Sequence, residues 1–248
     1  MKKIILFIII IFFVNIKNFA QEEKRLSYQI DLGTSIALPY KQMIYTYKTH
    51  TMDMTTPYTE YKSDYGYYAE GLIKYNLINK FSITTGFNYK YISYKIKDVW
   101  GLNISEGNIN NSTLSIPFLL NYKLSDKIPL SVSAGPYIEF VINAQELGVT
   151  HIDTSYITVI DPNDPMFKDQ DYNNNITKDY KMMSIGFSTQ LEYELKFSKK
   201  ISGILLSRFN YGLSNVLIID DEQNHKTAKN SANIWKNYNI LIGVGIRI

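Results

Sequence analysis

The sequence predicts an all-β fold, namely an eight-stranded antiparallel up-and-down transmembrane β-barrel with short periplasmic turns and long extracellular loops. Three observations support this prediction. Eight segments alternate apolar and polar residues with a period of two, and the connections between them alternate between short and long. After residue 20 no segment is long and apolar enough for a transmembrane helix, so a closed barrel is the remaining way to satisfy backbone groups in lipid.

The N-terminal residues predict a secretory signal peptide. Two lysines open the chain, the apolar run Ile4–Val14 follows, and the small Ala20 precedes a polar segment. The alternative is an N-terminal membrane anchor, which needs about 20 apolar residues. We therefore divide the chain into a signal peptide, residues 1–20, and a single outer-membrane β-barrel domain, residues 21–248.

Composition excludes several classes of protein. The chain has no cysteine, which excludes a lipid-anchored lipoprotein, disulfides, thiolate metal sites and cysteine catalysis. The formal net charge of +3 comes entirely from Lys2, Lys3 and Lys17, inside the predicted signal peptide. The remaining chain is balanced in charge, so it lacks the basic surface that nucleic-acid binding requires.

The eight predicted strands are long for a soluble protein and suit a tilted membrane crossing of roughly 9–11 residues with a rim. They cover residues 26–38, 65–77, 81–95, 112–124, 129–142, 181–197, 201–213 and 234–248. In the third strand one face carries Phe81, Ile83 and Phe87, and the other carries Ser82, Thr84 and Asn88. A soluble sheet with one buried face would give the same alternation, so the lengths of the connections are needed to distinguish it from a transmembrane barrel.

The connections alternate in length, and the strand count is even, as in outer-membrane barrels. In chain order they are residues 39–64, 78–80, 96–111, 125–128, 143–180, 198–200 and 214–233. Aromatic residues also gather at both ends of the strands, as expected at the two membrane interfaces. Those beside the short turns are Tyr75, Phe81, Tyr122, Tyr193 and Phe197, and those beside the long loops are Tyr65, Tyr67, Tyr89, Tyr91 and Trp235.

If the apolar face meets lipid, the polar face lines the interior, which side chains fill in an eight-stranded barrel. We expect an interior charge network of Asp31, Glu70, Lys74, Lys90, Lys123, Glu139, Glu192, Glu194, Arg208 and Arg247. Both signs are equally represented, and buried charges persist when they are paired and hydrogen-bonded. Counting from the turns places Glu70, Lys90, Glu139 and Arg208 toward the loops, and Asp31, Lys74, Glu192, Glu194 and Arg247 toward the turns. We predict a plugged, ion-paired interior; a proton or substrate path through these carboxylates is the alternative.

The residues that carry enzyme or metal chemistry elsewhere lie in the predicted loops. His50, His151 and His225 fall in three different loops, and no G-x-S-x-G motif occurs. A metal held by converging histidines, or a protease at the loop rim with His50 near Asp53 and His225 near Asp220, remains an alternative. We expect that the protein is not an enzyme and that it has no catalytic residue, cofactor or metal centre.

The connection 143–180 is the most distinctive, because it is acidic and rich in proline and asparagine. The segment from Asp169 begins like a calcium loop, but Asn174 replaces the required glycine and Tyr180 the required glutamate. One interpretation is a weak cation-binding loop with Asp161, Asp164, Asp169 and Asp171 as ligands. The other, which we favour, is a flexible, solvated surface loop.

A proline stands at the centre of the fourth predicted strand, TLSIPFLLNYKL, although proline removes a ladder hydrogen bond. By alternation Pro117 points inward and Pro136, in the next strand, faces lipid, which predicts a bulge or kink in this hairpin. This strand and the following PLSVSAGPYIEFVIN resemble the Bacteroidetes outer-membrane β-barrel domain, the PorT-like family, in which x-I-P-x-L-L-x-Y precedes a G-P-Y strand. The NFAQ end of the signal peptide fits the same group. The resemblance implies an integral outer-membrane protein and brings no catalytic residues; a namesake participates in protein secretion and gliding.

These observations predict a non-enzymatic integral protein of the bacterial outer membrane, with both termini in the periplasm. Its extracellular loops would serve surface or partner interaction, or membrane maintenance. The alternative is a narrow channel or a component of a secretion or gliding machinery. We expect outer-membrane lipid as surroundings, a protein or surface partner at residues 143–180, no nucleic acid, and a monomer.

Overall fold

The computed structural model describes residues 25–38, 58–78, 80–100, 102–125, 128–152, 168–198, 200–214 and 237–248. The predicted signal peptide lies outside these residues. Among the described residues, no helix is both long and apolar enough to cross a membrane.

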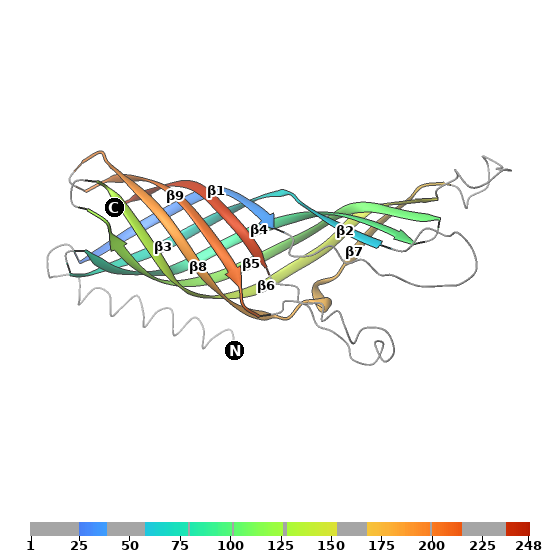
Figure 1. The fold of residues 1–248 in the computed structure, drawn as a ribbon, viewed down its shortest axis with the longest axis horizontal. Coiled ribbons are helices and arrows are strands. Elements are labelled where there is room, and N and C mark those ends of the chain that lie inside the picture. Colours follow the sequence, from blue (N-terminus) through green and yellow to red (C-terminus); the bar gives the residue numbers. More distant parts are fainter. Residues whose placement is uncertain are drawn as a thin grey trace.

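Eight antiparallel strands form a closed ring, in which each strand pairs with the next and the last pairs with the first (Figure 1). The ring consists of β1 (Leu26–Leu38), β3 (Tyr65–Ile78), β4 (Phe81–Trp100), β5 (Asn103–Lys123), β6 (Leu130–Ile152), β8 (Met183–Lys196), β9 (Ser202–Gly212) and β10 (Tyr238–Arg247). The pairing of β1 with β10 runs from Gln29 and Arg247 to Leu38 and Tyr238 and closes the barrel. The predicted fold class is therefore confirmed.

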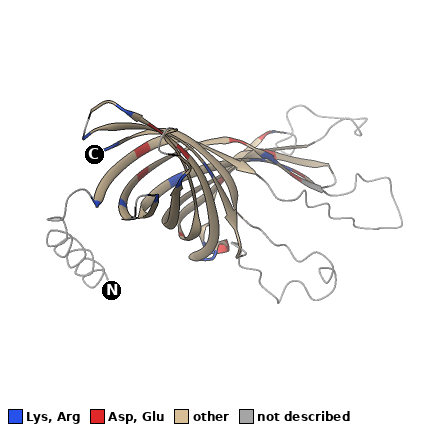
Figure 2. Ribbon diagram, turned by 60° about the vertical axis from the view of Figure 1, so that its left-hand side comes forward, with Lys and Arg blue, Asp and Glu red and all other residues tan. Residues whose placement is uncertain are grey.

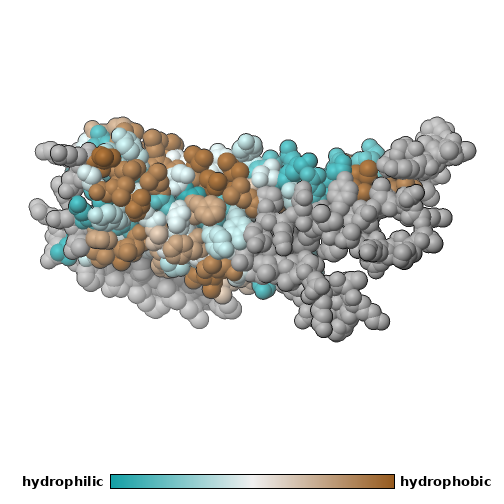
Figure 3. Space-filling view, viewed as in Figure 1, coloured by the Kyte–Doolittle hydropathy of each residue, from teal (hydrophilic) through white to brown (hydrophobic). Residues whose placement is uncertain are grey.

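The ring turns its apolar face outward and its polar face inward. In β8, from Met183 to Glu192, every second residue is buried; Ile185, Phe187 and Leu191 are exposed, whereas Ser188 and Gln190 are buried. Figure 3 shows the apolar side chains as a brown band over the barrel strands. Buried polar and exposed apolar residues are the reverse of a soluble protein and suit a barrel wall in lipid.

Three of the ring strands continue far beyond the barrel, and we call this part of the sheet the extension. It consists of residues 92–100 of β4, 103–111 of β5 and 144–152 of β6, flanked by β2 (Tyr58–Ser63) and β7 (Gln170–Asn175). A 3₁₀ turn, η3 (Thr177–Asp179), follows β7. In Figure 1 the extension projects from the end of the barrel opposite the C-terminus.

The extension corrects three of the predicted loops. The connection 39–64 contains β2, which pairs with β4. Residues 96–111 form a hairpin whose pairs reach Trp100 and Asn103, and the connection 143–180 begins as β6 and contains β7. The prediction ended these strands too early, because it required apolar residues on the outward face. Beyond the barrel the outward face carries Lys95 and Lys97, while Tyr94 and Ile96 are buried on the other face.

The two prolines interrupt the strand ladder without changing its register. Pro117 is buried inside the barrel and Pro136 is exposed outside, as predicted. The β4–β5 pairing skips Ile116 and Pro117 and resumes with the same offset. The bulge in this hairpin lies elsewhere, between Ser112 and Thr113, where the facing strand has one extra residue.

Aromatic rings lie in contact at both ends of the barrel wall. Near the short turns the ring centroids of Phe81 and Tyr122 are 4.9 Å apart. At the other end Tyr67 and Tyr91 stack with centroids 5.0 Å apart, and Tyr89 lies 6.4 Å from Tyr67. The predicted belt residue Trp235 lies outside the described residues.

Candidate functional site in the barrel interior

The barrel interior is filled by polar and charged side chains from every strand of the ring. The alternation of each strand points these side chains inward, where little or no solvent reaches them. Figure 2 marks the charged positions on the strands, which occur both around the ring and along the extension. The interior is therefore the part of the barrel in which charge, and any chemistry, is concentrated.

Two ion pairs lie in the half of the interior nearer the extension. The Arg208 guanidinium donates to both carboxylate oxygens of Glu70, at 2.6 and 2.9 Å, although β10 and β1 separate their strands. Asn88 Nδ2 donates to Glu70 at 2.9 Å, and Gln190 accepts from Arg208 Nε at 2.7 Å. These amides satisfy the remaining polar atoms of a pair that is almost completely buried, as a buried ion pair requires.

The second pair of this half joins Lys90 of β4 to Glu139 of β6. Both side chains are buried, and the Lys90 ammonium also lies 5.4 Å from the centre of the Tyr137 ring. Asn237 Nδ2 donates to the other oxygen of Glu139 at 2.6 Å. Gly186, on the strand beside Tyr137, makes room for its ring, since an added Cβ would lie 2.2 Å from it.

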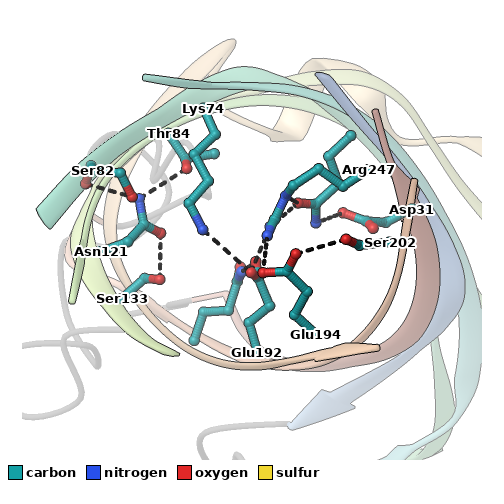
Figure 4. Close-up of polar contacts among 12 residues, drawn as sticks. Asp31, Lys74, Ser82, Thr84, Asn121, Ser133, Glu192, Glu194, Ser202 and Arg247 are labelled. Atoms are coloured by element: carbon teal, nitrogen blue, oxygen red, sulfur yellow. Dashed lines mark hydrogen bonds and ion pairs between the residues drawn. The ribbon is translucent and has the colours of Figure 1, made fainter. Parts of the chain in front are cut away.

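In the half nearer the short turns, one group of ion pairs crosses the whole lumen (Figure 4). Lys74 of β3 donates to Glu192 of β8 at 3.4 Å, and three strands separate β3 from β8 in either direction around the ring. Arg247 donates to Glu192 at 2.5 Å and to Glu194 at 3.4 Å. These side chains therefore bridge opposite walls of the barrel and obstruct its lumen.

A third set of hydrogen bonds ties neighbouring strands together along the wall. Asn121 Nδ2 donates to Thr84 Oγ1 at 2.9 Å and to the Ser82 carbonyl at 3.0 Å. Ser133 Oγ donates to Asn121 Oδ1 at 2.5 Å. These contacts, also drawn in Figure 4, involve no charge and fix the side chains of β4, β5 and β6.

Of the ten predicted interior residues, the structure brings eight together in five ion pairs, which do not cross between the two predicted layers. Asp31 is buried and accepts from Gln29 Nε2 at 2.7 Å, without an ion pair among the described residues. Lys123 lies half-buried at the turn end of β5. Sequence reasoning missed the uncharged partners Gln29, Asn88, Gln190 and Asn237. The first three occupy inward positions that alternation identifies, but an amide carries no charge to draw attention to it.

An apolar cluster lies where the barrel meets the extension. It contains Ala37, Ile92, Tyr94, Ile96 and Ile109, with Tyr61 and Ile176 packed against it. Beside it Tyr180 is buried against Ala144 and accepts from Asn111 Nδ2 at 3.3 Å. Burial raises the pKa of Tyr180 to about 12, so its hydroxyl stays neutral.

Most of the predicted acidic and histidine residues fall outside the part of the chain that the structure describes. These are Asp161, Asp164, His50 and His225, whereas His151 is the last residue but one of β6. Asp169 and Asp171 are exposed, and Asp171 belongs to β7, so the calcium-like start is an extended strand rather than a loop. Within the described ranges, no group of three histidine, aspartate or glutamate side chains could hold a metal ion.

The chain is similar to one known protein family and to several solved structures. The family described as outer membrane protein beta-barrel domain matches residues 19–217. Among solved structures, Ail of Yersinia pestis is 8% identical, with 90% of this chain and 99% of that chain covered and a TM-score of 0.41. OprG of Pseudomonas aeruginosa is 10% identical, with 90% and 95% covered and a TM-score of 0.41. Neisserial surface protein A is 13% identical, with 91% and 97% covered and a TM-score of 0.38. No curated protein matches the chain. Because the family match covers most of the sequence, this chain belongs to the outer membrane protein beta-barrel domain family.

Proposed function

We propose that this integral outer-membrane barrel is a non-enzymatic surface protein, whose closed interior anchors the extension outside the cell for contact with a partner. In this proposal both termini and the short turns face the periplasm. The small outer-membrane barrels to which the family belongs are typically non-enzymatic, which supports the first part. The barrel would act as a monomer surrounded by outer-membrane lipid.

The observation that carries the proposal is the set of ion pairs across the lumen. Lys74 and Glu192 come from opposite walls, and Arg208 and Glu70 meet across two intervening strands. Opening a path would leave these buried charges without partners, at a cost of several kcal/mol each. A lumen blocked in this way favours an anchoring role over transport.

The strand lengths support a display role for the extension. β9 and β10 have 11 and 10 residues, close to the roughly 9–11 that a tilted strand needs to cross the membrane. β4, β5 and β6 have 20, 21 and 23 residues. About half of each therefore lies beyond the membrane, in a sheet held rigidly by the barrel.

The alternative function, a narrow channel or a component of a secretion or gliding machinery, draws on the resemblance of the β5–β6 hairpin to the PorT-like family. Single-channel recording of the purified protein in planar bilayers separates the two. We expect no steady conductance, since the ion pairs fill the lumen. The variant Glu106→Gln, changed only in the extension, is the matched control and should be equally silent. A large steady conductance would contradict the anchoring role.

The absence of native cysteine makes the proposed orientation directly testable by single-cysteine labelling. Asn173→Cys lies in the exposed β7, and Lys200→Cys lies in the short turn between β8 and β9. A large membrane-impermeant maleimide should label the first variant on intact cells and the second only after the outer membrane is opened. The opposite labelling pattern would invert the proposed topology.

A further inference from the structure

The charges inside the barrel are not balanced at every position, because the buried carboxyl group of Asp31 has no basic partner in the described part of the chain. Every other interior carboxylate of the predicted set accepts from a lysine or arginine, as described above. Asp31 is completely buried, and within the described part of the chain it takes part in no ion pair. One of its oxygens, Oδ1, is buried without a hydrogen-bond partner in that part of the chain. An isolated ionised carboxylate in such a place would cost far more than any single interaction offered to it.

The nearest acidic neighbour makes this cost larger. Asp31 on β1 and Glu70 on β3 are direct partners across the two strands, and both side chains are buried on the lumen side. Like charges at directly opposite positions in a sheet destabilise it. Asp31, Glu70 and Arg208 thus form a cluster with two acids and one base, and the base is already committed bidentately to Glu70.

In the described part of the chain, the basic side chains that point into the lumen around Asp31 already bind other carboxylates. The charged and titratable side chains that point into the lumen from the strands around β1 are Tyr68, Glu70 and Lys74 of β3, Lys90 of β4, Arg208 of β9, and Arg247 of β10. Lys74 and Arg247 bind Glu192, and Lys90 binds Glu139. Arg247 reaches Asp31 only through Gln29, which accepts from Arg247 Nε at 3.0 Å and donates to Asp31 Oδ2 at 2.7 Å.

We propose that Asp31 and Glu70 bind a single proton between their carboxyl groups at neutral pH, and that this proton makes the cluster of Asp31, Glu70 and Arg208 neutral. Two carboxyl groups at directly paired positions of a buried site resist ionising together, and a shared proton turns their repulsion into a hydrogen bond. The site has room for the Asp31 carboxyl because Gly245 on β10 has no side chain; an added Cβ would lie 1.7 Å from Asp31 Oδ1. The inference rests on the closed interior of the proposed function.

The bound proton couples the stability of the barrel to pH. In the unfolded chain Asp31 loses its proton near its ordinary pKa, about 4. Between that pH and the alkaline range the folded barrel therefore binds one proton more than the unfolded chain. Stability consequently falls as pH rises across this range.

Thermal unfolding of the full chain in detergent, followed from about pH 5 to about pH 9, tests the proposal with two variants. Asp31→Asn keeps the shape and replaces the shared proton by an amide N–H. We expect its midpoint to be independent of pH and to exceed that of the wild type by about 5 °C at the alkaline end. Glu139→Gln is the matched control, because it neutralises an equally buried carboxylate that has an ion-pair partner, and it should lower the midpoint at every pH.

Equal destabilisation by Asp31→Asn and Glu139→Gln would overturn the proposal. A stabilisation of the wild type by sodium but not by choline, absent from Asp31→Asn, would also overturn it and assign a metal cation to the site. If Asp31→Asn does not fold, infrared spectroscopy of the wild type decides: a protonated carboxyl band at neutral pH is expected, and its absence contradicts the shared proton. Single-channel recording tests the closed interior separately, so the two proposals can fail independently.

Discussion

The barrel and the extension share three strands, yet the polarity of the two strand faces is reversed between them. In the barrel part of β4 the inward residues are polar, such as Asn88 and Lys90, and the outward residues are apolar. From Ile92 to Lys97 the same inward row is apolar, with Tyr94 and Ile96 buried, and the outward row is polar, with Lys95 and Lys97. The strand itself continues without a break in its pairing.

This reversal follows from the surroundings of each face. Lipid contacts the outside of the barrel and excludes charge there, so polar groups have to gather in the lumen. Beyond the membrane the outer face meets water, and the extension buries its apolar side as a soluble sheet does. The reversal in β4 therefore marks where the strand leaves the membrane, directly after the stacked ring of Tyr91.

The largest effect on stability is expected when an ion pair in the barrel interior is removed. Glu70→Ala leaves Arg208 buried without its carboxylate, and we expect a loss of about 3–5 kcal/mol in the free energy of unfolding. Urea unfolding in lipid vesicles, followed by tryptophan fluorescence, measures this loss. A loss below about 1 kcal/mol, the range of an exposed ion pair, would show that water reaches the interior.

An effect of intermediate size is expected when valine is replaced by arginine on the outward face of the barrel, and the same replacement on the outward face of the extension is the comparison. Val244→Arg places a charge on the exposed apolar wall of β10, where arginine in lipid costs about 2–4 kcal/mol near the bilayer midplane. Val149→Arg, on the outward face of the extension, stands between Glu106 and Asp171 and should change stability by no more than about 0.5 kcal/mol. Equal losses in the same unfolding assay would contradict the assignment of the two faces to lipid and water.

The ring and its strand directions could be predicted from the sequence because lipid imposes one strict alternation on every wall strand. The extension could not be predicted with the same rule, although its period of two is visible from Ile92 to Lys97 with the two faces exchanged. A rule that allows this exchange would have extended β4 to Lys97, three residues short of its end at Trp100. The amide partners in the lumen share the inward positions, but which amide meets which charge depends on the stagger of the strands. That stagger is fixed by the pairing, and residue types alone do not reveal it.

The interior charges show the same limit. The predicted interior set has equal numbers of acidic and basic residues. Whether each charge meets an opposite charge depends on which strands face one another across the lumen. Glu192 takes two cations from β3 and β10, while Asp31 has a second carboxyl group as its direct strand partner. Local imbalance within a balanced total is therefore a property of the register and closure of the barrel.

The smallest expected effect concerns the ion pair on the outward face of the extension. Lys97 donates to Glu106 at 2.5 Å, and this hydrogen bond and charge lower the pKa of the Glu106 carboxyl below its ordinary value. The ion pair therefore stabilises the fold above the ordinary pKa of glutamate. This stabilisation is lost as the pH falls through the lowered pKa of Glu106. Because both side chains are exposed, we expect Glu106→Gln to lower the free energy of unfolding by less than about 1 kcal/mol at neutral pH and not at all in acid.

Urea unfolding at neutral and acidic pH, and at low and high salt, measures the difference between the variant and the wild type. High salt should remove most of it, since exposed charges are screened, whereas the loss in Glu70→Ala should persist. A salt-resistant loss at Glu106 would show that the extension, like the barrel, shields its charges from water.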